Sequence, residues 1–239
     1  MLRDGAVRTR VRRALDRLER AFGRPRPERR LPPLDELVLT VLSQHTSDLN
    51  RDRAYASLRR RFPRWEQVLQ ASTADVEEAI RCGGLARTKS GVIQEILRTV
   101  LHERRSLDLS FLKRLPIGEA KAYLRRLKGV GEKTACCVLL FACGRPAFPV
   151  DTHIHRVAGR LGWLKAKATP ADTHAALAAL IPEERYYASH INLIRLGRRV
   201  CRARAPACAA CPLRGACRFA AKNAGRPRAD GLRARRTLY

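Results

Sequence analysis

The sequence predicts an all-α protein, and three observations lead to that fold class. Apolar residues recur at helical spacing along most of the 239-residue chain, as at Val7, Val11, Leu15, Leu18 and Phe22. Alternating runs of β-branched residues, which would indicate strands, are essentially absent from the sequence. Capping residues and Gly or Pro breaks separate the helical segments. We therefore expect roughly ten or more helices and no sheet.

The helices are expected to follow one another with short breaks. An Arg- and Pro-rich segment over residues 24–33 ends the first helix. Thr46, Ser47 and Asp48 are expected to cap one later helix, and Thr73 another in a capping-box order. The predicted helices cover residues 1–22, 34–44, 49–62, 73–80, 88–105, 108–114, 117–127, 134–144, 153–162, 170–181 and 184–200.

An excess of positive charge is the strongest signal in the composition. The chain carries 49 Lys and Arg against 22 Asp and Glu, a formal net charge of +27. A field of this sign favours a polyanionic partner, most commonly nucleic acid, over a merely soluble basic surface. Aromatic residues make up only 5% of the chain, too few for an extended platform that stacks unpaired bases. We therefore expect a duplex that is held through its phosphates.

Nothing in the sequence indicates a membrane protein. No run approaches the roughly eighteen apolar residues that a membrane-spanning helix needs. The Arg-rich N-terminus faintly resembles an organelle transit peptide, but such peptides avoid acidic residues such as Asp4, Asp16 and Glu19. We expect a cytoplasmic, nucleoid-associated monomer of the prokaryotic type.

The eight cysteines fall into two groups. The first group, expected to pack in the interior, consists of Cys82, Cys136, Cys137 and Cys143. The second group is Cys201, Cys208, Cys211 and Cys217, separated by six, two and five residues. Four thiolates at this spacing can converge on one metal centre. A zinc site usually has two close cysteine pairs and this loop has one, which favours an iron–sulfur cluster while leaving zinc open.

The stretch "LKGVGEKTA" is a candidate for an anion-binding turn with a reactive lysine. Gly129 and Gly131 permit a tight turn whose N–H groups can approach a phosphate closely, and a helix N-terminus follows. Lys133 lies just inside that helix, and Asp151 precedes another helix 18 residues later. A lysine that attacks carbon must be neutral, and a nearby carboxylate can accept its proton. Lys133 and Asp151 are therefore a candidate nucleophile and electrostatic partner, although Asp151 alone could simply be a helix cap.

These segments together resemble a known family. "LKGVGEKTACCVLLFACGRPAFPVDTHIHRV" and the four-cysteine loop closely resemble the endonuclease III family of helix-hairpin-helix DNA glycosylases. The resemblance covers residues 34–220 and implies a [4Fe-4S] cluster on the four cysteines. It also implies two helical domains with DNA bound in the cleft between them. These would be a six-helix domain over residues 26–146, a cluster domain from residues 1–25 and 147–221, and a flexible basic tail over 222–239.

The resemblance implies a base excision repair enzyme that removes oxidised pyrimidines from duplex DNA and cuts 3′ to the abasic site by β-elimination. The damaged base would be flipped out of the duplex. Lys133 would attack C1′ and form a Schiff base, while Asp151 would stabilise the cationic sugar. Related mismatch glycosylases that do not cut the strand carry another residue at the lysine position, so Lys133 indicates a bifunctional glycosylase/AP lyase. Two alternatives stay open: a member directed at uracil or mismatched bases, and a lesion-binding protein with weak catalysis.

The resemblance also implies which residues contact DNA. "LSQHTSD" is similar to a family segment whose glutamine fills the space left by the flipped base. Aligned without a gap, that position holds His45, with Gln44 one residue earlier. Leu85 matches a leucine that wedges into the duplex, and Lys128 replaces a proline of the family's hairpin. The other residues expected to contact DNA are Gly129, Val130, Gly131, His153, Arg202 and Arg204.

Overall fold

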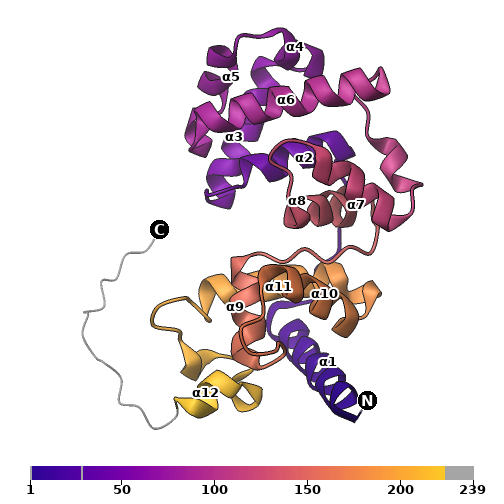
Figure 1. Ribbon diagram of the computed structural model, residues 1–239. Helices are drawn as coiled ribbons and strands as arrows, with labels where there is room; N and C mark the ends of the chain where they lie inside the picture. The colour runs from indigo at the N-terminus through magenta and orange to yellow at the C-terminus, as the bar shows by residue number, and fades with distance from the viewer. Residues whose placement is uncertain (1, 28, 224–239) are drawn as a thin grey trace, which may run out of the picture.

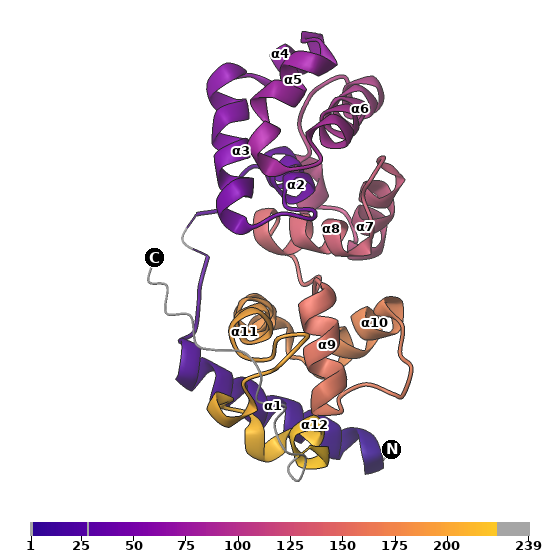
Figure 2. The same cartoon turned by 90° about the vertical axis from the view of Figure 1, so that its left-hand side faces the viewer.

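The computed structural model describes residues 2–27 and 29–223, and that part of the chain contains helices and no strand. The helices form two lobes, one above the other in Figure 1. Helices α2 to α8 build one lobe, and α1 joins α9 to α12 in the other. Figure 2 shows the chain crossing between the lobes twice, once after α1 and once before α9. The predicted all-α fold with two helical domains is confirmed.

The first lobe is organised around α2. This helix packs against α3, α6 and α8, and its side chains Leu37, Val38 and Val41 are fully buried. The apolar face of α6 covers them through Ile93 and Leu97. The α-helices of this lobe are α2 (Pro33–Leu42), α3 (Asp48–Arg61), α4 (Trp65–Gln70), α5 (Thr73–Ala79), α6 (Ala86–Arg104), α7 (Ile117–Arg126) and α8 (Glu132–Cys137).

The second lobe is built from both ends of the described chain. The predicted stripe at Val11, Leu15 and Leu18 is buried against the later helices. Arg185 adds ion pairs to Asp16 and Glu19 of the first helix, at 2.7 and 2.9 Å. The α-helices of this lobe are α1 (Leu2–Phe22), α9 (Thr152–Leu161), α10 (Pro170–Leu180), α11 (Tyr186–Arg199) and α12 (Arg218–Lys222).

Each lobe has its own apolar core. The buried residues of the first core lie between Leu34 and Ala147. Those of the second core come from α1, from Leu140 and from Phe148 onward. The exact domain boundaries at residues 25/26 and 146/147 stay a prediction. Residues 224–239 of the expected flexible tail lie outside the described residues. In the described part, no helix is long and apolar enough to cross a membrane.

Three local predictions differ from the structure. Cys82, expected to pack in the interior, is exposed, because it lies in the short turn η1 (Arg81–Gly83) at the surface. Ser72, not Thr73, caps α5, because its hydroxyl accepts a hydrogen bond from the Asp75 N–H at 3.1 Å. Thr73 instead donates to the Gln94 side chain at 2.7 Å. The helix expected over 134–144 widens after α8 into a π-helical turn, η3 (Val138–Ala142), in which the Cys143 N–H donates to the carbonyl five residues earlier. Such turns are common beside functional sites.

Candidate active site

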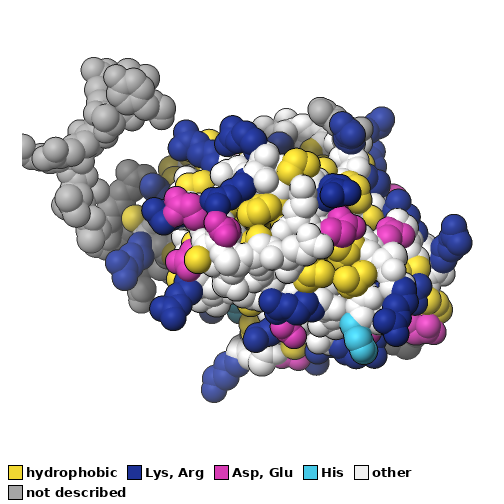
Figure 3. Space-filling view, turned by 90° about the horizontal axis from the view of Figure 1, so that it is seen from above, with side chains coloured by type: hydrophobic (Ala, Val, Ile, Leu, Met, Phe, Trp, Pro, Cys, Tyr) yellow, Lys and Arg dark blue, Asp and Glu magenta, His cyan; other side chains and the backbone are white. Residues whose placement is uncertain are grey.

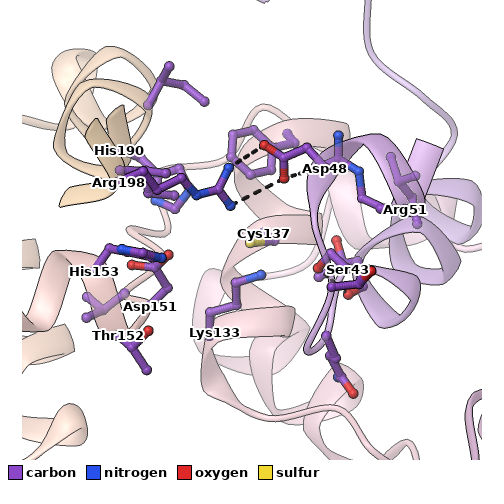
Figure 4. Close-up of a pocket in the computed structure, with 18 of the residues that line it drawn as sticks. Ser43, Asp48, Arg51, Lys133, Cys137, Asp151, Thr152, His153, His190 and Arg198 are labelled. Carbon is purple, nitrogen blue, oxygen red and sulfur yellow. Dashed lines mark hydrogen bonds and ion pairs between the residues drawn. The ribbon is translucent and has the colours of Figure 1, made fainter. Parts of the chain in front are cut away.

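A cavity of about 920 Å³ lies between the two lobes. The first lobe contributes α2, the loop that leads to α3, and α8 to its walls. The second lobe contributes the start of α9 and one face of α11. In Figure 4 the labelled side chains from both lobes point into the same space.

Lys133 enters this cavity from the first turn of α8. The hairpin before it depends on Gly129, which has φ +74° in the left-handed region that favours glycine. A side chain there would also come within 3.0 Å of Val92. The tight turn closes with a hydrogen bond from the Val130 N–H to the Leu127 carbonyl at 3.1 Å. The hairpin therefore holds Lys133 at the cavity wall on a rigid element.

Asp151 lies opposite Lys133, at the start of α9. It is the cap of that helix, because its Oδ1 accepts a hydrogen bond from the Ile154 N–H at 2.8 Å. Asp151 is therefore both the cap of α9 and a residue of the cavity wall. The cap bond fixes the carboxylate in the orientation that brings it to the cavity.

Two neutral groups line the cavity beside this pair. Burial raises the pKa of the Cys137 thiol to about 11, so it keeps its proton at neutral pH. Burial lowers the pKa of His190 to about 4, and its Nδ1–H donates to the Pro149 carbonyl at 3.0 Å. Neither group therefore adds charge to the cavity at neutral pH.

Glu36 is a further carboxylate of the cavity that the sequence did not single out. It lies on α2 in a stripe with Thr40 and Ser43, which also line the cavity. Burial raises the pKa of Glu36 to about 7, and the Thr40 hydroxyl donates to its Oε1 at 3.1 Å. The signal that could have found this residue is the polar spacing of 36, 40 and 43 along a helix whose other positions are largely apolar.

An ion pair joins the two lobes at the cavity. Arg198 of α11 binds Asp48 at the start of α3, with one nitrogen-to-oxygen distance of 3.3 Å. Figure 4 shows this pair above Lys133 and Asp151. Burial opposes ionisation of Asp48, but its hydrogen bond to Arg198 and the charge of that side chain lower its pKa below the ordinary value. This contact links the two lobes at the cavity wall.

The residues predicted to fill the space of a flipped base lie at the cavity. Gln44 and His45 both line it, and the Gln44 amide donates to the Gly129 carbonyl at 3.3 Å, which ties their loop to the hairpin. His45 has φ +52° and Leu85 has φ +50°, a strained conformation for non-glycine residues. The Leu85 side chain is 57% exposed, unusual for a leucine. Strained backbone of this kind is found most often at functional sites.

The other expected DNA-contacting residues are spread more widely. Lys128 is exposed on the hairpin, and His153 lines the cavity beside Arg156. The Val130 side chain is buried in the core, so only its backbone can face a ligand. Arg202 and Arg204 are exposed and do not line the cavity.

Positive charge also covers the surface away from the cavity. Figure 3 looks onto the end of the first lobe, where Lys and Arg side chains are spread around the margin with fewer acidic groups between them. The basic side chains of this face are consistent with the net charge of +27.

The four-cysteine loop closes against α9. All four thiols are unbridged, half-buried and line one small hollow: Cys201, Cys208, Cys211 and Cys217. Burial raises the pKa of the Cys211 thiol, and the three other cysteines are close enough to raise it further. Arg160 reaches the loop through the Cys201 sulfur at 3.4 Å and the Arg202 carbonyl at 2.6 Å. Four soft sulfur donors facing one hollow fit a metal centre.

A second group of possible ligands lies between the lobes. Glu132, Cys136 and His174 place their ligand atoms within 4.8 Å of one another. However, Glu132 already forms ion pairs with Lys121 and Arg125. Burial also raises the pKa of the Cys136 thiol to about 12. A cation here would have to displace two positive side chains, so we assign this group to contacts between the lobes.

Comparison with known proteins identifies the class to which this fold and site belong. Residues 38–183 match the model of the HhH-GPD superfamily of base excision DNA repair proteins. The endonuclease III of Thermotoga maritima is 34% identical over 195 residues, which cover 82% of this chain and 87% of that protein. A candidate DNA glycosylase of Arabidopsis thaliana is 45% identical over 151 residues, 63% of this chain, and the chain spans about half (52%) of its length.

Solved structures show the same relationship. A non-covalent endonuclease III–DNA complex matches with a TM-score of 0.78 and 29% identity, covering 91% of this chain and 98% of that one. A trapped endonuclease III–DNA covalent intermediate matches with a TM-score of 0.77 and 28% identity over the same shares. The chain belongs to the HhH-GPD superfamily of base excision repair enzymes and, within it, to the endonuclease III family.

Proposed function

We propose that this protein is a bifunctional DNA N-glycosylase and AP lyase that acts on oxidised pyrimidines in duplex DNA. The observation that carries the proposal is the meeting of Lys133 and Asp151 in one cavity between the lobes. The cavity is large enough for a nucleotide flipped out of the duplex. The similarity to endonuclease III structures with bound DNA supports DNA as the partner.

The geometry suits a covalent mechanism. Lys133 would attack C1′ of the flipped nucleotide, and the base would leave. Asp151, held by the cap of α9, would accept a proton from the lysine ammonium before the attack and then, with a neighbouring water carrying that proton away, stabilise positive charge on the sugar. The resulting Schiff base would undergo β-elimination and cut the strand 3′ to the lesion. The protein would act as a monomer, since both groups come from one chain.

We also propose that the four cysteines of the 201–217 loop hold a [4Fe-4S] cluster. The four thiols face one small hollow, and the loop has a single close cysteine pair where a zinc site usually has two. That spacing supports an iron–sulfur cluster. Bound there, the cluster would fix the conformation of the loop that carries Arg202 and Arg204.

Borohydride trapping tests the proposed function. A duplex with one abasic site, thymine glycol or uracil is incubated with the protein and reduced, which converts a lysine–sugar Schiff base into a stable covalent complex. We expect trapping on the abasic and thymine glycol duplexes, and none with Lys133→Ala.

Lys128→Ala serves as the matched control, because this exposed lysine is near Lys133 but outside the cavity lining. Its complex should still form, though with weaker binding. Best trapping on uracil would indicate the uracil-directed alternative. Tight binding without trapping on any duplex would indicate a lesion-binding protein.

A further inference from the structure

We propose that Glu36 is a third catalytic residue, which gives a proton to the departing base and regains one from Lys133. This inference rests on the proposed glycosylase activity and adds a proton carrier to it. It concerns base removal, not the later strand cut.

The first argument is position. α2 packs directly against α8, and Glu36 lines the same cavity as Lys133 and Asp151. The other carboxylates of the cavity are already engaged, Asp48 with Arg198 and Asp151 with the cap of its helix. Glu36 uses its Oε1 for the Thr40 hydroxyl at 3.1 Å, and no described residue donates a hydrogen bond to its Oε2. That oxygen is available to a bound base.

The second argument is protonation. Burial raises the pKa of Glu36 to about 7, and the Thr40 hydrogen bond and the charges of Arg51 and Lys133 offset only part of this rise. The ideal general acid has a pKa near the working pH, because both of its protonation states are then populated. The titratable or charged groups around Glu36 are Arg51 and Tyr55 of α3, Lys133 and Cys137 of α8, and Cys143 after η3.

The proton balance closes without another reactant. As the neutral Lys133 nitrogen bonds to C1′, the bond from C1′ to the base breaks and its electron pair leaves with the base. Protonated Glu36 gives its proton to the base and becomes a carboxylate. The new secondary ammonium at Lys133 then gives one proton to Glu36. The net result moves one proton from the lysine to the base and restores the acid.

Glu36→Gln separates this role from a structural one. Glutamine keeps the shape and can still accept the Thr40 hydrogen bond, but it cannot carry a proton. We expect the single-turnover excision of thymine glycol to fall roughly 100-fold or more. Borohydride trapping on a ready-made abasic site should stay within about two-fold, because no base departs from it. The decline of wild-type excision as pH rises above about 7 should disappear in the variant.

A change of leaving group sharpens the test. Among oxidised pyrimidines, 5-hydroxyuracil has an unsaturated ring that spreads the charge of the departing anion, so it needs less protonation than thymine glycol, whose ring is saturated. The loss caused by Glu36→Gln should therefore be smaller on 5-hydroxyuracil than on thymine glycol. Equal losses on the two bases would contradict a proton transfer to the base.

Asp35→Asn is the matched control. This neighbouring carboxylate lies outside the cavity lining and accepts hydrogen bonds from Tyr55 at 2.7 Å and Trp65 at 3.2 Å. Its loss should lower the melting temperature but leave excision unchanged. The role of Glu36 is contradicted if Glu36→Gln excises bases as fast as wild type, or if it loses equal activity on thymine glycol and abasic duplexes. Either result leaves the proposed function standing. A wild-type chain that excises no base overturns the proposed function, and this inference with it.

Discussion

At the scale of single residues, Asp151 both caps α9 and faces Lys133, and substitution can separate the two roles. Asparagine accepts the same bond from the Ile154 N–H, whereas alanine cannot. We expect Asp151→Ala to lower the free energy of unfolding by about 1 kcal/mol and Asp151→Asn by much less. Both should lose strand cutting, because both lack the negative charge. Urea unfolding and a nicking assay measure the two effects, and wild-type nicking by Asp151→Asn would contradict the catalytic role.

The raised pKa of the single residue Glu36 should make the stability of the protein depend on pH. Its pKa rises from 4.5 to about 7 on folding, so the folded state keeps a proton that the unfolded chain has lost. The contribution of Glu36 to the free energy of unfolding is fully present below about pH 4.5. It is lost as the pH rises through about 7, which lowers the free energy of unfolding by roughly 3 kcal/mol. Glu36→Gln removes this decline. We expect the variant to unfold at higher urea than wild type near pH 8 and at similar urea near pH 5; the same difference at both values would contradict the raised pKa.

At the scale of elements, Lys89 holds together the two loops that carry His45 and Leu85. Its side chain is 3% exposed, and its ammonium donates to the carbonyls of Leu42 at 2.8 Å and Gly83 at 2.9 Å. Lys89→Met leaves both carbonyls without this donor, which should lower the free energy of unfolding by about 1–3 kcal/mol. Hydrogen exchange should quicken in both loops together. The exposed Lys165→Met is the control, and faster exchange in only one loop would contradict a shared clamp.

The sequence predicts the helices well, because each amphipathic stripe is a local pattern. It placed most helices, yet it missed α4, which has only six residues and too few turns for a clear stripe. The pattern predicted Thr73 as the cap of α5, but the cap is Ser72. Either hydroxyl suits the sequence pattern, and the residue that caps is fixed by where the helical backbone begins. The polar spacing of Glu36, Thr40 and Ser43 is the sequence signal for this face of α2, but the sequence alone cannot show that the face is buried, because the cavity forms only when α8 and α9 meet α2.

At the scale of the whole molecule, the four-cysteine loop is expected to stabilise the second lobe. Arg156 and Arg160 of α9 both bond to carbonyls of this loop, so its order is coupled to the helix that Asp151 begins. Cys208→Ser should lower the iron content and the melting temperature together. Cys82→Ser, an exposed cysteine of the other lobe, should change neither. Full iron content in Cys208→Ser would contradict the cluster assignment.

The charge of the whole molecule predicts how binding responds to salt. A protein with a net charge of +27 should neutralise many phosphates and release their counterions. With 6–10 phosphate contacts, the slope of log affinity against log salt should be about −5 to −9. Lys128→Ala should make this slope shallower by about one, because it removes one phosphate contact at the hairpin. Arg98→Ala should not change it, since Arg98 is already paired with Glu95 at 3.0 Å. Fluorescence anisotropy across a salt series measures both slopes, and an equal change in the two variants would show that the charge acts as a diffuse field rather than through the hairpin.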